Sequence, residues 1–393
     1  MSILEKIKLR PLVEGKAPKD TTVVVAMSGG VDSSVCTALL HKLGYNVIGI
    51  TLQLWDYTPA SEAASGENKK FGTCCALDDV YDARRVCQTI GVPHYVLNYE
   101  SEFKEAVVDD FVETYLAGAT PIPCVRCNQR IKFDSFMDKA KELGADILVT
   151  GHYIRKDHDG DGKAILRRGL DRKKDQSYFL FTTTQEQLDF SDFPLGQLTK
   201  DETRELAEEL GLHVAGKKDS QDICFVPGGD YRKVVRKYAP DAVKGGNLVS
   251  EAGEVLGQHD GILGYTVGQR KGLGGGFGVP MYVVEIRANT REVVLGPKES
   301  LAKSTFTVKE LDWVDRAIAI DGKQVIAQVR YAHEGNEAII KDLGEGRVEV
   351  TMLSPAYQIS PGQAAVFYDG DRMLGGGWIE VPESAKIKVQ IEM

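Results

Sequence analysis

The chain has 393 residues, of which 42% are hydrophobic and 27% are charged, a composition typical of a globular protein long enough for two or three domains. With 48 Lys and Arg against 57 Asp and Glu, the net charge is −9, so the whole molecule does not attract nucleic acid and any such contact needs local basic patches. No apolar run is long enough to cross a bilayer, and the N-terminal stretch lacks the apolar core of a signal peptide, so we expect a cytoplasmic protein.

The first half of the chain alternates between short β-branched runs and longer helical patterns, from about Thr21 to Gly216. Strands are expected at 21–27, 46–52, 93–99 and 145–151, and helices at 101–118, 132–144 and 200–212. This alternation predicts an α/β fold with a doubly wound parallel sheet. A long polar loop is expected at 62–75.

The second half has a different pattern. From about Pro227 it has short strands and a glycine-rich stretch, GLGGGFG, at 272–278. From about Ser304, alternating apolar runs follow one another at short intervals with turn residues between them, which predicts a small antiparallel β-barrel. The expected division is an N-terminal extension at 1–20, the α/β domain at 21–226, a central β domain at 227–298 and a C-terminal barrel at 303–393.

The stretch SGGVDSS, residues 28–34, directly follows the first predicted strand and runs on into an apolar helical pattern. A glycine turn that enters a helix offers backbone N–H groups and the positive end of the helix dipole, and the serine hydroxyls add donors, so phosphate is the natural ligand. A plain βα turn is the alternative. The chain has no G-x-x-x-x-G-K-[ST] motif, and 272–278 lacks the context of a dinucleotide fingerprint.

This stretch resembles the PP-loop of the ATP pyrophosphatases, which cleave ATP between the α- and β-phosphates and leave AMP on a substrate oxygen. The resemblance implies that ATP and Mg²⁺ are cofactors, that the turn cradles the leaving pyrophosphate, and that Asp32 acts through Mg²⁺. The residues expected to bind ATP here are Ala26, Met27, Ser28, Gly29, Gly30, Val31, Asp32, Ser33 and Ser34.

Seven cysteines in a long chain without a secretory signal do not predict a disulfide framework, so they are packed, metal-bound or catalytic. Cys124 and Cys127 form a C-x-x-C, which is typical of a redox pair, half a zinc site or two packed cysteines, and there is no second such pair to complete a four-cysteine zinc site. Cys36 and Cys87 lie in apolar helical patterns and are expected in the core, whereas the roles of Cys74 and Cys75 stay open.

Basic neighbours favour reactive thiolates at two cysteines. Cys127 lies between Arg126 and Arg130, and Cys224 follows Lys217 and Lys218 by a few residues. We therefore expect reactive cysteines at these positions.

Two basic segments are candidates for a nucleic-acid contact. Residues 163–174 have six basic residues against one acidic, and residues 231–244 have five against one. In the second segment the basic residues recur at i, i+4 spacing, which would align Arg232, Lys233, Arg236 and Lys237 along one helix face. A solvated charged face is the alternative.

Seven motifs occur in the order found in the tRNA-specific 2-thiouridylases, the MnmA family: AMSGGVDSSV, TPIPCVRCNQRIKF, VTGHY, KKDQSYFL, FPLGQLTKDETRELA, DSQDICF and GYTVGQRKGLG. The resemblance runs from about Thr21 to the C-terminus. It implies three domains that clamp the anticodon arm of tRNA, and ATP-dependent conversion of the wobble uridine to 2-thiouridine with release of AMP and pyrophosphate. It also implies a sulfur donor, such as a cysteine desulfurase or a sulfur-relay protein.

Carried over to this chain, the resemblance makes Cys127 the attacking cysteine and Cys224 the cysteine that carries a persulfide. ATP adenylates O2 of the uracil, the persulfide sulfur or sulfide released from it attacks C2, and Cys127 closes a disulfide bond with Cys224. Leu52 and Gly151 match contacts on the adenosine side. The residues expected to contact tRNA are Ile122, Pro123, Cys124, Lys174, Asp175, Gln176, Arg330 and Tyr331.

The chain departs from the family pattern at TPIPC, since many members have Asn in place of Ile122 and Asp in place of Cys124. The departure leaves a second mechanism open, because Cys124, Cys127 and Cys224 could hold a [4Fe–4S] cluster that delivers sulfide to C2. Sequence does not choose between cluster and persulfide, since both need thiolates at the same points.

Two other functions also stay open. One is a PP-loop enzyme that adenylates a small molecule, and the other is a metal-stabilised RNA-binding protein without catalysis. His152 in VTGHY is the best histidine candidate for a role in the site, and a hydrogen-bonded structural histidine fits the sequence equally well.

Overall fold

A computed structural model describes residues 3–7, 10–55, 77–219, 223–240, 244–314, 319–357 and 359–381. The chain forms two compact units. The first consists of Met1–Ala106 and Arg126–Gly229, and the second of Val107–Val125 and Asp230–Met393. The predicted polar loop at 62–75, with Cys74 and Cys75, lies outside the described residues.

The first unit contains a five-stranded parallel sheet. Its strands follow the order β3-β2-β1-β4-β7, and each neighbouring pair is parallel. The strands are β1 (Thr22–Ala26), β2 (Asn46–Gln53), β3 (His94–Asn98), β4 (Ile147–Val149) and β7 (Ser191–Asp192). The four predicted strands and the parallel sheet are confirmed. The fifth strand was not predicted, because two polar residues give no apolar run.

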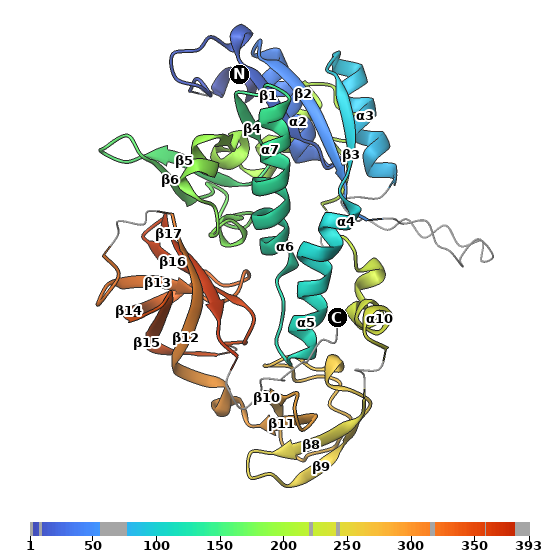
Figure 1. The fold of residues 1–393 in the computed structure, drawn as a ribbon, viewed down its shortest axis with the longest axis vertical. Coiled ribbons are helices and arrows are strands. Elements are labelled where there is room, and N and C mark those ends of the chain that lie inside the picture. The colour runs from blue at the N-terminus through green and yellow to red at the C-terminus, as the bar shows by residue number, and fades with distance from the viewer. Residues whose placement is uncertain are drawn as a thin grey trace, which may run out of the picture. The chain divides into compact units, whose positions relative to one another are not determined.

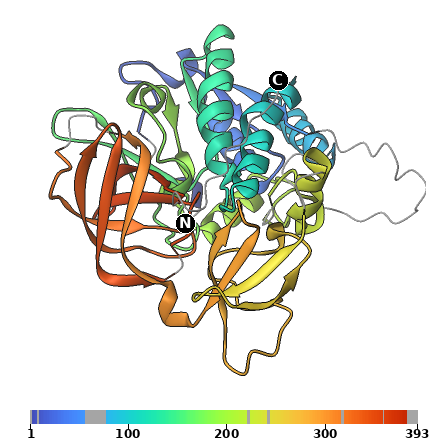
Figure 2. The same cartoon turned by 60° about the horizontal axis from the view of Figure 1, so that its bottom comes forward.

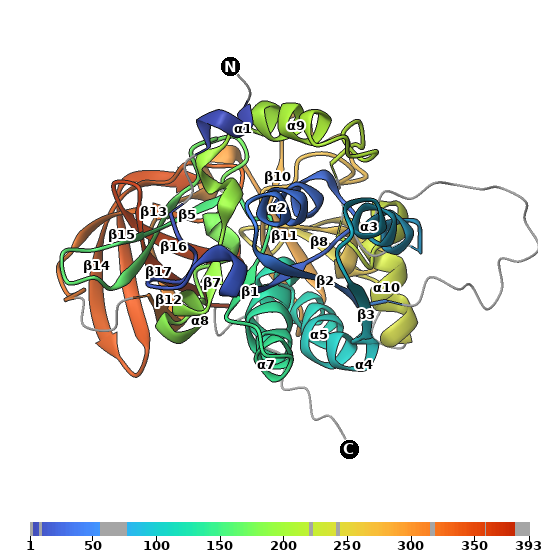
Figure 3. The ribbon, with the colours of Figure 1, turned by 90° about the horizontal axis from the view of Figure 1, so that it is seen from above.

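Helices cover both faces of this sheet, with α2 and α3 on one face and α7 on the other (Figure 3). The helices of this unit are α1 (Ile3–Lys6), α2 (Val31–Lys42), α3 (Leu77–Ile90), α4 (Glu100–Phe103), α7 (Phe136–Glu142), α8 (Gln185–Asp189) and α9 (Lys200–Glu209). Helix α9 packs against α2 and begins with a capping box in which Thr199 and Glu202 satisfy each other's backbone N–H groups. A hairpin of β5 (Ile154–His158) and β6 (Ala164–Arg168) also belongs to this unit.

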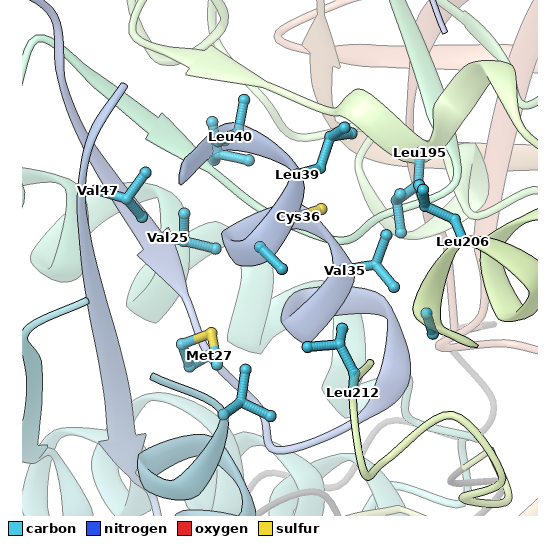
Figure 4. Close-up of a cluster of buried hydrophobic side chains, with 14 of the residues drawn as sticks. Val25, Met27, Val35, Cys36, Leu39, Leu40, Val47, Leu195, Leu206 and Leu212 are labelled. Atoms are coloured by element: carbon cyan, nitrogen blue, oxygen red, sulfur yellow. The ribbon is translucent and has the colours of Figure 1, made fainter. Parts of the chain in front are cut away.

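The core of this unit lies between the sheet and helices α2 and α9 (Figure 4). Val25 of β1 and Leu39 of α2 have no exposed surface, and Leu206 of α9 packs into the same cluster. Cys36 and Cys87 are also fully buried, which confirms them as core residues. Burial raises the pKa of Cys87 to about 11, so this thiol stays protonated and unreactive at neutral pH.

Two helical stretches contain π-helical turns. One runs through α4, a π stretch (Lys104–Val108) and α5 (Asp109–Leu116), and the other through α6 (Pro123–Arg126), a π stretch (Cys127–Ser135) and α7. The two predicted helices in these regions are confirmed, although the second starts before its predicted first residue. Such π turns are frequent at functional sites.

The second unit carries the central β region and the barrel. The central sheet follows the order β10-β11-β8-β9, and its strands are β8 (Gly246–Ser250), β9 (Val255–His259), β10 (Tyr282–Arg287) and β11 (Glu292–Gly296). Helix α10 (Tyr231–Tyr238) packs against α5, where the rings of Tyr231 and Tyr115 stack at 4.5 Å.

The barrel has six antiparallel strands and closes through pairing of the first strand with the last (Figures 1 and 2). Its strands are β12 (Ala302–Trp313), β13 (Gln324–Gln328), β14 (Asn336–Gly344), β15 (Arg347–Tyr357), β16 (Ala364–Asp369) and β17 (Arg372–Ile379). The predicted C-terminal barrel is confirmed. Within the described ranges, no helix has the length and apolar character needed to span a membrane.

Candidate nucleotide and sulfur-transfer site

The turn between β1 and α2 is shaped to approach an anion closely. Gly29 has a φ of +73°, and a Cβ there would lie 2.1 Å from the carbonyl oxygen of Asp79, so only glycine fits. The Ser33 hydroxyl accepts a hydrogen bond from the backbone N–H of Ser28 at 3.1 Å, and the Ser34 hydroxyl donates to the carbonyl of Gly30 at 2.7 Å. The turn therefore leads directly to the positive N-terminus of the twelve-residue helix α2.

The sheet register brings the other predicted ATP residues to the same edge. Ala26 of β1 pairs with Ile50 of β2, and Val25 of β1 pairs with Val149 of β4. Leu52 comes two residues after Ile50, and Gly151 comes two residues after Val149. Both residues therefore lie at the carboxyl ends of strands that neighbour β1. A Cβ on Gly151 would lie 3.0 Å from the backbone N of Ser33, so this glycine allows close packing against the start of α2. This edge is where parallel α/β sheets bind their ligands.

Asp32, in the first turn of α2, is bound by two side chains, and its own side chain is 33% exposed. Lys200 donates to both of its carboxylate oxygens, at 2.8 and 3.0 Å, and the Tyr153 hydroxyl lies 2.9 Å from Oδ1. Burial, together with the charge of Asp32, raises the pKa of Tyr153, so its hydroxyl stays protonated. The carboxylate is thus arranged to hold Lys200. The sequence-based expectation that Asp32 acts through Mg²⁺ stays a prediction.

Asp219 is the centre of a second group of charges that the sequence did not indicate. It accepts from Lys174 at 2.6 Å, from Lys200 at 2.9 Å and from Arg204 at 2.8 Å. Partial burial works against the charged form, but the hydrogen bonds from Lys174 and Lys200 outweigh it and lower the pKa of Asp219 to about 2. Asp219 is therefore a carboxylate throughout the physiological pH range.

Lys217 ties the segment before Cys224 to the glycine turn. Its ammonium group donates to the carbonyl of Gly29 at 3.0 Å and to Asp79 at 2.6 Å, and it also bonds Asp82. Burial opposes its charge, and the bonds to these two aspartates more than compensate and raise the pKa of Lys217. Lys217 was expected to favour a thiolate at Cys224, and the structure shows that its charge is used at the glycine turn.

Cys127 and Cys224 belong to the same unit. Cys127 is the first residue of a π stretch that contacts α4, and it is 8% exposed. Cys224 is partly exposed, and the ring of the next residue, Phe225, packs edge-on against Phe103 of α4 at 5.5 Å. Cys124 is exposed and belongs to the other unit. In the described part of the chain, no three His, Cys, Asp or Glu side chains are grouped to hold a metal ion.

His152 is held among neutral groups. Its Nδ1 lies 2.7 Å from the Thr150 hydroxyl, and its ring packs near those of Phe133 and Phe193. Burial, with a smaller contribution from Lys132, lowers the pKa of His152 well below its usual range. This setting favours the structural interpretation of His152.

The predicted tRNA residues at 174–176 have different surroundings. Asp175 is buried and accepts from the backbone N–H groups of Gly169 and Ser177, and the Gln176 side chain accepts from the backbone N–H of Tyr153. These two side chains shape the loop. The Lys174 side chain is 36% exposed and is the member of the three with the best access to a ligand.

The other predicted tRNA residues lie in the second unit. Ile122 and Pro123 are buried, and Cys124 is exposed. Tyr331 is 42% exposed just after β13, and the Gln328 side chain donates to the carbonyls of Arg330 and Tyr331, which fixes the backbone of this turn.

The predicted basic helix in the second unit is confirmed. In α10, Val234 and Val235 are buried. The exposed residues are the basic ones: Arg232, Lys233, Arg236 and Lys237. The helix therefore has one apolar face toward its unit and one cationic face toward solvent.

Fold and site together define a doubly wound α/β protein with a phosphate-binding type of turn at the end of its first strand. Three family models match consecutive parts of the chain: the tRNA methyl transferase HUP domain at residues 21–228, the tRNA methyl transferase PRC-barrel domain at 232–297, and the aminomethyltransferase beta-barrel domain at 303–379.

Curated relatives match over almost the full length. The tRNA-specific 2-thiouridylase MnmA of Rhodospirillum centenum is 52% identical over 378 residues, which is 94% of each chain. The protein of the same name from Paracoccus denitrificans is 52% identical and covers 93% of this chain and 92% of its own, and that from Rickettsia canadensis is 50% identical and covers 92% and 96%. The chain belongs to the family of tRNA-specific 2-thiouridylases, MnmA.

Solved structures give much weaker matches. The U34-tRNA thiolase NcsA from Methanococcus maripaludis with its [4Fe-4S] cluster matches 61% of this chain and 73% of its own, at 19% identity and a TM-score of 0.34. A similarity at this level supports no argument about the present chain.

Proposed function

We propose that this protein catalyses the ATP-dependent 2-thiolation of the wobble uridine of tRNA. The observation that carries the proposal is the 50–52% identity to 2-thiouridylases over more than nine-tenths of the chain. The glycine turn, the strand-end residues and the two cysteines of the first unit supply the parts that such a reaction needs.

The turn at residues 28–34 holds the phosphates of ATP, with Leu52 and Gly151 on the adenosine side. The N-terminus of α2 and the Lys200 ammonium, held beside the turn by Asp32, offer positive charge to the leaving pyrophosphate. Uracil O2 attacks the α-phosphorus, the bond between the α- and β-phosphates breaks, and pyrophosphate leaves. Mg²⁺ would enter with the nucleotide phosphates and offset their negative charge.

Sulfur transfer follows at Cys224 and Cys127. The terminal sulfur of a Cys224 persulfide attacks C2 of the adenylated uracil and forms the C–S bond, and AMP departs with O2. The Cys127 thiolate attacks Sγ of Cys224, so the persulfide S–S bond breaks and its electron pair stays on the sulfur bound to C2. The resulting Cys127–Cys224 disulfide needs a thiol reductant, and a desulfurase or sulfur-relay protein renews the persulfide.

RNA binding is proposed at three places. These are the cationic face of α10, the Arg330–Tyr331 turn and Lys174. The first two lie in the second unit and the last in the first. Because the molecule carries a net charge of −9, these local cations restrict the RNA phosphates to few parts of the surface.

The proposal is tested by measuring AMP and pyrophosphate formed from ATP with and without tRNA. We expect both products only when tRNA with a wobble uridine and Mg²⁺ are present, and we expect Asp32→Ala to abolish them while tRNA still binds. ATP cleavage that needs a small carboxylate or nucleotide in place of tRNA would instead identify a PP-loop enzyme of another specificity.

A further inference from the structure

Four charged side chains form a continuous chain of ion pairs in the first unit. Asp32 pairs with Lys200 at 2.8 Å, Lys200 with Asp219 at 2.9 Å, and Asp219 with Lys174 at 2.6 Å. The Lys200 side chain is only 9% exposed, so its charge depends on its carboxylate partners more than on water. One end of this chain lies at the glycine turn, and the other at Lys174, a loop residue whose side chain is 36% exposed.

Asp219 is the fixed member of this chain. Arg204 binds Asp219 at 2.8 Å and also donates to the backbone carbonyls of Ala215 and Lys217, at 2.8 and 2.9 Å. These bonds hold the carboxylate against its own backbone segment. Lys174 is partly exposed and can turn toward a new anion, and Lys200 can shift from Asp219 toward the glycine turn while Asp32 still binds it.

Both proposed ligands are anions, and each attracts a cation that Asp219 also holds. A phosphate at the glycine turn attracts Lys200, and an RNA phosphate attracts Lys174. When one lysine has turned away, Asp219 keeps fewer cations and holds the remaining lysine more strongly, because less positive charge then offsets its own. The anion that binds second must therefore draw its lysine away from a stronger ion pair with Asp219.

We propose that Asp219 is a positioning residue that couples the nucleotide site to Lys174 with negative sign, so that bound nucleotide weakens RNA binding and bound RNA weakens nucleotide binding. The proposal rests on the proposed function, which places ATP and tRNA at the two ends. By linkage the two effects are equal in size. Release of pyrophosphate then returns Lys200 to Asp219 and strengthens the hold on the adenylated RNA during sulfur transfer.

The test compares the dissociation constant of tRNA with and without saturating α,β-methylene-ATP and Mg²⁺, since this analogue is not cleaved at the reacting bond. For the wild-type protein we expect the nucleotide to weaken tRNA binding about fivefold, and tRNA to weaken nucleotide binding by the same factor. In Asp219→Asn both ratios should fall to about one, since no carboxylate is left to link the two lysines.

Two further variants make the test specific. Asp146→Asn removes a carboxylate that also holds a lysine at 2.6 Å, Lys16, but at the amino end of β1, and it should keep the wild-type coupling. Lys174→Gln removes the far end of the chain at a partly exposed position, so it carries the test if Asp219→Asn fails to fold, and its coupling should also be lost.

Several results would overturn the inference. They are positive coupling in the wild type, no coupling, or coupling that persists in Asp219→Asn and Lys174→Gln, since the last would mean simple repulsion between two anions. A wild-type protein that forms 2-thiouridine yet shows no coupling would refute this inference alone. A protein that binds no tRNA would refute the proposed function instead.

Discussion

The basic segments 163–174 and 231–244 use their charges in different ways. In the first, the chain folds as strand β6 and a turn, and Arg168 is buried in an ion pair with Asp175 at 3.3 Å, with both side chains less than 10% exposed. In the second, the chain folds as α10, and its four basic side chains are exposed opposite two buried valines. The two segments have similar charge counts, but Arg168 of the first has a buried structural role, whereas the four basic residues of α10 form an accessible cationic face.

The difference follows from the spacing of the apolar residues. In α10, Val234 and Val235 are adjacent and the charges flank them at helical spacing, so burial of the valines leaves the charges outside. In β6, Arg168 points to the buried side of its strand and needs an anionic partner there. The number of charges predicts neither the buried Arg168 nor the exposed cationic face of α10. The apolar periodicity predicts the exposed face of α10.

The largest expected effect is on stability. Arg168→Ala leaves the Asp175 carboxylate buried without its cation, so the free energy of unfolding should fall by about 3 kcal/mol or more. Urea denaturation followed by circular dichroism measures it. Arg172→Ala, at an exposed position of the same segment, is the control and should change little. Equal stability of Arg168→Ala and wild type would contradict the structural role of this segment.

The next effect is on RNA binding. Replacing Arg232, Lys233, Arg236 and Lys237 together by Ala should weaken tRNA binding about a hundredfold at moderate salt and reduce the slope of log K against log salt by about three units, because each lost phosphate contact retains counterions. Filter binding over a salt series measures both. The fold should persist, since these side chains are exposed. The control is the double variant Arg84→Ala/Arg85→Ala on α3. An unchanged slope in the α10 variant would show that this face contacts solvent and does not bind RNA.

A smaller effect is expected at Lys174, which binds Asp219 and is also a proposed RNA contact. Lys174→Ala should weaken tRNA binding about fivefold and reduce the salt slope by about one unit, because a single phosphate contact is lost. The same salt series measures this change. If tRNA affinity stayed at the wild-type value, Lys174 would serve only to hold Asp219.

The smallest effect is a pH dependence. The pKa of Asp219 is lowered to about 2, so its charged form contributes stability above the pKa of an unfolded aspartate and loses it as pH falls toward 2. The difference in free energy of unfolding between wild type and Asp219→Asn should therefore be constant from pH 8 to about 5 and shrink below about 4. A difference that changed near neutral pH would point to another titrating group.

Much of the fold could be predicted from local patterns. The β-branched runs that became β1, β2 and β4, and the alternating runs of the barrel, bury one or both faces of a strand, so apolar spacing located them, whereas no residue of β3 is buried. The strand β7 and the π stretch that starts at Cys127 were missed. Their existence depends on neighbours in space, since a two-residue strand and a wider helical turn leave no period in the sequence.

The site was predictable only in part, for the same reason. The glycine turn is a local motif, and its shape at Gly29 is set by residues close in sequence and by one contact with α3. The partner of Asp32 is 168 residues away, and Lys217 reaches Gly29 across 188 residues. Such pairs form because α9 and the segment after it pack against α2. This packing brings together residues that are far apart in the sequence, and local sequence patterns do not predict it.

Nucleoside mass spectrometry shows directly whether the protein thiolates the wobble uridine of tRNA. A tRNA with an unmodified wobble uridine is incubated with the protein, ATP, Mg²⁺ and a persulfide-generating desulfurase, then digested to nucleosides. We expect 2-thiouridine at the wobble position in an ATP-dependent yield, and none with Cys127→Ser or Cys224→Ser. Unmodified uridine after incubation with wild-type protein that binds both tRNA and ATP, or 2-thiouridine formed equally without ATP, would contradict this function.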